Sequence, residues 1–178
     1  MRPVCRFGDI FEVKLDDGRK RFFQFVCRDL EQLNSDVIRV FKHTYLKTDF
    51  PDCQDIISDE IECYTHTSVY TGAKYGFWSK YGKSHDVGSL DVYFRDSNDY
   101  GFRVDEPHIV KKSFRWYVWK INEERKFVGH LRKKYHCAYQ GLVMAPIHVA
   151  NAIKKQEPIV PRYISIGAKT AFTHETRL

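Results

Sequence analysis

The chain has 178 residues, the length of one ordinary domain, and 43% of them are apolar, enough to bury a core. Its 13 Phe, 11 Tyr and 3 Trp exclude an intrinsically disordered chain and favour strands over helices. No apolar run approaches the roughly 18 residues that a membrane-spanning helix needs, so we expect no membrane partner.

Charge is divided unevenly along the chain. Residues 1–110 hold 15 Lys and Arg against 19 Asp and Glu, whereas residues 111–178 hold 14 against 4. The basic final third favours either an anionic partner or a well-solvated outer surface, and both interpretations stay open. Five scattered cysteines without a Cys-x-x-Cys pair are typical of a reduced, cytoplasmic protein. The first residues lack the apolar stretch of a signal peptide.

The first predicted elements are two strands joined by a tight turn. Phe11 and Val13 alternate with polar residues, which is the period of a strand with one buried face. Asp17-Gly18 then supplies the positive φ angles of a hairpin turn. We therefore predict a hairpin over residues 10–27, and a three-residue turn would place Phe11 opposite Phe23.

The middle of the chain is less regular. Apolar alternation predicts strands over residues 37–41, 63–70 and 90–94, with a turn at 96–99. Residues 49–62 are acidic and contain Pro51, which favours loop or edge structure. Residues 71–88 mix glycines, aromatic residues and lysines, and we expect one long loop anchored by its aromatic rings.

The last third carries the strongest strand and the one convincing helix. Residues 113–121 have apolar side chains on both faces, so both faces should be covered. A turn then leads into a second hairpin, which spans residues 114–131. Pro146 is expected to open a helix that ends at Lys155, and a short strand is predicted over residues 163–166.

These elements predict a single domain over residues 1–178 of the α+β class, mainly β. We expect a strongly curved antiparallel sheet or partly open barrel that contains both hairpins, with one or two short helices. The helix at 146–155 would pack against an edge or opening of that sheet.

The acidic segment is the candidate binding surface. A run of carboxylates is often a solvated loop, but it can also imitate phosphate and occupy the cationic groove of a nuclease. The candidate residues are Asp49, Asp52, Asp55, Asp59, Glu60 and Glu62.

The sequence gives little support for a metal or a catalytic site. Cys63 and His66 could join His136 and Cys137 around zinc, but neighbours on a strand point to opposite faces. The chain has no nucleophile elbow and no phosphate-binding loop. The loop at 70–85 could stack bases on its rings, although such loops also bury their rings. We expect no catalysis, metal or cofactor, and no nucleic-acid partner.

Two parts of the chain resemble the immunity protein 26 family, bacterial proteins encoded beside polymorphic toxins. The resembling segments are Gly8-Asp9-Ile10-Phe11 with Asp17-Gly18, Trp119-Lys120-Ile121, Val128-Gly129-His130-Leu131, and Gly141-Leu142-Val143 with Pro146. The resemblance covers about residues 8–27 and 114–155. It implies a cytoplasmic immunity protein, a toxin inhibitor without catalysis that acts by protein–protein interaction with one cognate toxin. The alternative is a nucleic-acid-binding small β-barrel or a PemK-like ribonuclease, which also opens with Gly-Asp and a strand.

Overall fold

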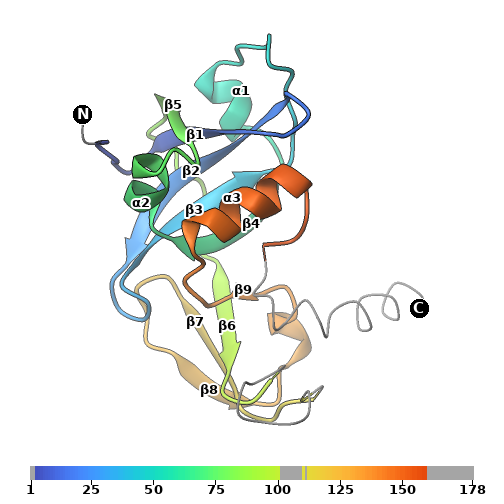
Figure 1. The fold of residues 1–178 in the computed structure, drawn as a ribbon. Coiled ribbons are helices and arrows are strands. Elements are labelled where there is room, and N and C mark those ends of the chain that lie inside the picture. The colour runs from blue at the N-terminus through green and yellow to red at the C-terminus, as the bar shows by residue number, and fades with distance from the viewer. Residues whose placement is uncertain (1–2, 101–109, 111, 160–178) are drawn as a thin grey trace.

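The computed structural model describes residues 3–100, 110 and 112–159. Within these residues the chain forms two β-sheets and three short α-helices (Figure 1). Sheet A, the larger one, has the strand order β4-β3-β2-β1-β5, and all its neighbouring strands are antiparallel. Its strands are β1 (Asp9–Lys14), β2 (Lys20–Asp29), β3 (Ser35–Phe41), β4 (Ile61–Thr67) and β5 (Ser79–Lys83).

The β1–β2 hairpin confirms the first sequence prediction. Phe11 lies opposite Phe23, and their rings stack with centroids 5.2 Å apart. Gly18 has a φ of +83° in the connecting turn, and a Cβ added there would meet nothing within 4 Å. The turn therefore requires glycine for its backbone conformation and not for space.

One face of sheet A packs against α2 (Val69–Lys74) and α3 (Pro146–Lys155). Val149 and Ile153 of α3 are buried in one cluster with Phe11 and other side chains of this face, and Figure 1 shows α3 lying across the sheet. The predicted helix is confirmed, but its predicted place at an edge or opening is wrong. The apolar side of α3 is buried against the face of the sheet and not at its edge.

Residues 71–88 are not the single long loop that we expected, because they contain the end of α2 and all of β5. The expected aromatic anchor is Trp78, which is buried and donates its indole N–H to the Val69 carbonyl at 3.0 Å. A Cβ on Gly72 would lie 1.8 Å from the Trp78 ring, so α2 can sit this close only with glycine at that position. Tyr75, by contrast, is 66% exposed.

The opposite face of sheet A is covered at one end by α1 (Cys53–Ile57). Ile56 and Ile57 of this helix pack against Phe22 and Phe41. The helix lies within the acidic segment, where the sequence indicated only loop or edge structure. Five residues are too few for a helical period to stand out in a sequence.

The middle of the same face is polar and yet buried. The Gln24 side-chain amide donates to the carbonyls of Gly8, Ser84 and Asp86 at 3.1–3.2 Å. Arg39 donates to the Gln24 Oε1 atom at 2.8 Å and to the Asp86 carbonyl at 3.0 Å. These bonds fix the connection after β5 against the sheet, because buried polar groups need partners.

Sheet B has the strand order β8-β7-β6-β9, and β9 runs parallel to β6. Its strands are β6 (Tyr93–Ser97), β7 (Trp116–Lys120), β8 (Lys126–Gly129) and β9 (Tyr139–Gln140), with a 3₁₀ turn η1 at Lys133–Tyr135. The β6 strand begins three residues later than the predicted strand at 90–94 and includes part of the predicted turn at 96–99. The predicted strand at 163–166 lies outside the described residues.

The second predicted hairpin is confirmed as β7–β8, but the prediction of one sheet holding both hairpins is wrong. Trp119 of β7 is buried beneath sheet A with Val26 and Val37, so sheet B covers sheet A instead of extending it. The α+β, mainly β class is confirmed. Across the described residues the sheets do not close into a barrel, and there are three α-helices where one or two were expected.

A buried acid–imidazole pair lies at the junction of the sheets. The His66 Nε2 atom on β4 is 3.1 Å from the Asp29 Oδ2 atom on β2, and both side chains are fully buried. The Phe94 ring of sheet B lies 4.4 Å from the imidazole, and the Asn122 amide donates to Asp29 Oδ1 at 3.4 Å. Burial lowers the pKa of His66, and the hydrogen bond that Asp29 accepts from the imidazole offsets this only in part.

We expect Gly18→Val to lower the free energy of unfolding by about 1–3 kcal/mol, because valine must hold a positive φ. Urea unfolding of the two proteins measures the difference. Gly18→Asn is the control and should cost less, since asparagine tolerates the left-handed region. Equal stability of the wild type and the valine variant would show that the turn has another conformation.

We expect acid to destabilise the fold through His66. The unfolded chain binds a proton at the ordinary histidine pKa of about 6.5, while the folded chain does so only at lower pH. The stabilisation is therefore complete above this pH and is lost as the pH falls through it towards the folded pKa. Thermal melts from pH 8 to pH 5 should show a steeper decline for the wild type than for His66→Gln. Parallel pH profiles would contradict this assignment.

Candidate functional site

The acidic candidates lie mainly in the connection between β3 and β4, residues 42–60, which carries α1. The Asp49 carboxylate accepts the Leu46 amide at 2.8 Å and closes a turn. Asp52 caps the N-terminus of α1 by accepting the Asp55 amide at 2.8 Å, a role for which aspartate is well suited. These two carboxylates therefore shape the connection as well as contributing charge.

The remaining carboxylates differ in the partners that they bind. Asp59 accepts two backbone amides, from His43 and Glu60, each at 2.6 Å. Glu60 forms an ion pair with Lys42 in which both side chains are largely exposed. Glu62 on β4 pairs instead with Arg21 at 2.6 Å, and the Arg21 side chain is only 3% exposed. Glu62 thus neutralises a buried cation, and this role separates it from the exposed acids.

Tyr45 is a half-buried side chain that is influenced by the charge of three of the candidate acids. Burial raises the pKa of its phenol, and the negative charges of Asp59, Asp55 and Asp49 raise it further. Three of the predicted carboxylates therefore act electrostatically on a single side chain. Their negative charge would favour a cationic partner.

Two apolar residues of this connection escaped the sequence interpretation. Phe50 is 82% exposed and Leu46 is 58% exposed. The buried Lys20 ammonium lies 4.9 Å from the centre of the Phe50 ring, which ties the loop to β2. The only sequence signal was an apolar pair in a polar, non-periodic segment, and no pattern in it distinguishes exposure from burial. We name Leu46, Phe50, Asp49, Asp52, Asp55, Asp59 and Glu60 the acidic surface.

This arrangement resembles the anatomy of a protein interface. Interfaces commonly place a few large apolar or aromatic side chains at the centre, with polar and charged groups at the rim. Single exposed apolar residues are ordinary, but Leu46 and Phe50 lie in the same connection as the carboxylates. Exposed apolar side chains beside carboxylates would suit a cationic protein surface that has an apolar recess.

The four candidate zinc ligands do not come together. His66 is paired with Asp29 at the sheet junction, while Cys63 packs on the other face of sheet A. Burial raises the pKa of Cys63 to about 12. His136 and Cys137 are exposed beside η1. Within the described residues, no group of three or more His, Cys, Asp or Glu side chains could hold a metal ion.

A groove of about 570 Å³ lies between the first described residues, β1, β5 and α3. Three lysines line it, together with Glu12 and the ring of Phe77. Lys80 pairs with the buried Asp9 at 2.8 Å, and Lys154 lies 3.8 Å from Asp16. These carboxylates neutralise two of the three cations, so little net positive charge remains in the groove.

Comparisons of the chain with family models, with curated proteins and with solved structures gave no match. In the part of the chain that the structure describes, no helix is both long and apolar enough to cross a membrane.

Glu62 and Glu60 form a matched pair for a stability test. Glu62→Gln leaves the buried Arg21 charge without its carboxylate, and we expect a loss of about 1–3 kcal/mol in the free energy of unfolding. Glu60→Gln removes an exposed ion pair and should cost at most about 0.5 kcal/mol. Urea unfolding of both variants provides the comparison. Equal losses would mean that Glu62 is as free to bind a partner as Glu60.

Proposed function

We propose that this chain is an immunity protein that binds a cognate bacterial toxin through the acidic surface and thereby neutralises it. In this proposal the protein acts in the cytoplasm, by occupying the toxin, and performs no catalysis. The observation that carries the proposal is the 82% exposure of Phe50 within the acidic connection. The resemblance of residues 8–27 and 114–155 to the immunity protein 26 family supports it independently.

The apolar and acidic residues would contribute in different ways. A Phe50 ring inserted into a recess of the toxin would be desolvated and would slow dissociation. Asp52 and Asp55 are exposed, and at the rim their charges would mainly accelerate encounter with a cationic toxin. Many toxins that act on nucleic acid have cationic sites, because such a site holds phosphate. Carboxylates can imitate that phosphate.

Hydrogen bonds within the connection order the acidic surface before a partner binds. The two bonds to Asp59 and the α1 cap at Asp52 hold the connection in one shape. A surface ordered before binding loses less conformational entropy when the partner arrives. The ordered connection therefore favours tight binding of the toxin.

We expect the chain to protect cells against the toxin encoded beside it, and to form a stoichiometric complex with that toxin in vitro. Phe50→Ala should weaken the complex by about 30-fold, mostly through faster dissociation. The combined variant Asp52→Asn and Asp55→Asn should slow association and flatten its dependence on salt. Asparagine keeps the α1 cap, so the fold is preserved. Surface plasmon resonance at several salt concentrations separates the two effects.

The matched control replaces Arg132 and Lys133 with Gln, two exposed cations at η1 in the connection between β8 and β9. This variant should bind and protect as the wild type does. Loss of protection through these cations, with Phe50→Ala and the asparagine variant unaffected, would contradict the proposed surface. Failure of the wild type to protect against the neighbouring toxin would contradict the proposed function itself.

A further inference from the structure

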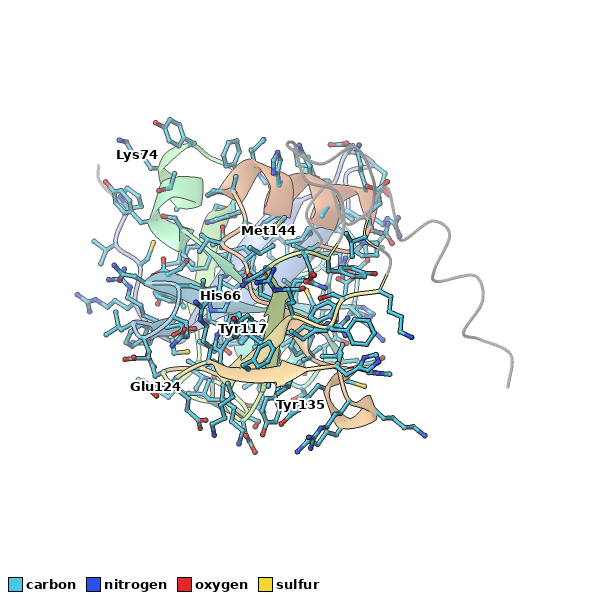
Figure 2. All side chains as sticks on the ribbon, turned by 90° about the horizontal axis from the view of Figure 1, so that it is seen from below. His66, Lys74, Tyr117, Glu124, Tyr135 and Met144 are labelled. Atoms are coloured by element: carbon cyan, nitrogen blue, oxygen red, sulfur yellow. The ribbon has the colours of Figure 1, made fainter. Side chains whose placement is uncertain are left out.

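The β7–β8 hairpin lies at the opposite end of the molecule from α1 and its acidic connection (Figure 1). It presents aromatic rings to solvent. Phe114 is 56% exposed and Phe127 is 61% exposed. Tyr117 lies directly across the strands from Phe127, with ring centroids 5.3 Å apart. Figure 2 looks at sheet B from below and labels Tyr117 on β7, with Glu124 at the turn of the hairpin. We name Phe114, Tyr117 and Phe127 the hairpin aromatics.

Cations accompany these rings. The Arg125 guanidinium lies 4.8 Å from the centre of the Tyr117 ring, and the Lys112 ammonium lies 5.5 Å from that of Phe114. The His130 ring also packs on Phe114, at 4.5 Å between centroids. Phe114 and Tyr117 therefore each combine a π-face with a cationic group nearby.

The hairpin and the connection that follows it carry an excess of positive charge. Residues 112–135 contain eight Lys and Arg against two Glu. Within the described part of the chain, the one ion pair formed by these eight cations joins Lys120 to Asp91. Neighbouring cations such as Arg125 and Lys126 remain available to meet an anion, and concentrated positive charge of this kind attracts polyanions.

Burial within the fold does not account for all of these rings. Trp119 also lies on β7, and it is 4% exposed in the cluster that joins the two sheets. Phe127 belongs to β8, an outer strand of sheet B. It is not part of the buried cluster between the two sheets. Trp119 is thus buried at the junction of the sheets, whereas Phe127 is exposed to solvent.

Contrary to the expectation from the sequence, we propose that the β7–β8 hairpin binds single-stranded nucleic acid. This proposal goes beyond the proposed toxin inhibition and uses different residues. Bases stack on Phe114 and Phe127, while Lys112, Arg125 and Lys126 meet the phosphates. A duplex hides its base faces within the stack, so the aromatic contacts select single strands. Two rings more than half exposed offer little area to a lipid bilayer, whereas one ring is enough to stack one base.

The test measures binding of fluorescein-labelled oligo-uridine and oligo-thymidine, each of about 12 nucleotides, by fluorescence anisotropy over a range of salt concentrations. Phe127→Ala and Phe114→Ala should each weaken binding by about tenfold without changing the salt dependence. Arg125→Gln should weaken binding and reduce the slope of log affinity against log salt by about 0.7. All three residues are exposed, and circular dichroism melts verify the fold.

The matched control is a second exposed aromatic–cation pair. The Lys74 ammonium lies 5.7 Å from the centre of the Tyr75 ring on the far side of the molecule, and Lys74 is labelled in Figure 2. Tyr75→Ala and Lys74→Gln should leave oligonucleotide binding unchanged. Loss of binding in these variants instead would overturn the assignment to the hairpin.

Further arms separate nucleic acid from other anions. Phosphatidylserine vesicles and poly-glutamate should bind more weakly than the oligonucleotides, and they should not respond to Phe127→Ala. The proposal is refuted if poly-glutamate binds as well as the oligonucleotides, or if neither phenylalanine variant weakens oligonucleotide binding. Either result would mean that the surface attracts anions by charge alone. Vesicle binding that depends on Phe127 would identify a membrane-binding surface instead. Protection against a toxin is a separate readout, so either proposal can fail alone.

Discussion

The structure depends on the burial of β2 and β3 on both faces of sheet A. Every residue of β3 is buried, as are all but two of β2, although these strands contain Gln24, Asp29 and Arg39. Buried polar groups must be paired within the protein, and the partners come from segments far away in the sequence. The connection at 84–88 is held by Gln24 and Arg39, and the turn after β7 is held by Asp29. Polar pairing thus determines where these connections cross the sheet.

The same constraint separates the two charged surfaces. One end of sheet A is covered by α1 and its acidic connection, and the other end by sheet B with its basic hairpin. In Figure 1 these coverings lie at opposite ends of the molecule. Charges further apart than about 10 Å interact little at physiological salt, so the two surfaces act independently. A molecule divided in this way also has a preferred orientation in the field of a charged partner.

The cationic groups of sheet A show why charge alone does not identify a binding site. Arg21 and Lys20 are almost fully buried, and each has a carboxylate partner, Glu62 or Glu12. Arg39 is equally buried but is satisfied by an amide and a carbonyl oxygen. These cations stabilise the interior, whereas those near β8 face solvent without carboxylates. The distinction rests on burial and partners, because a buried charge must be neutralised or hydrogen-bonded.

Local sequence determined the hairpins and the longest helix. Alternation around Phe11, the turn at Gly18 and the proline that opens α3 are short-range features, and short-range sterics decide them. The sequence also located the acidic connection, although it grouped Glu62 with five residues that the fold separates from it. What only the tertiary structure decided is which surfaces meet. Each hairpin follows from its local pattern, but whether Trp119 extends a sheet or covers one depends on contacts with Val26 and Val37, on strands far away in the sequence. The exposure of Phe50 and Phe127 was likewise decided by long-range packing, since an apolar side chain carries no local signal of whether the core will reach it.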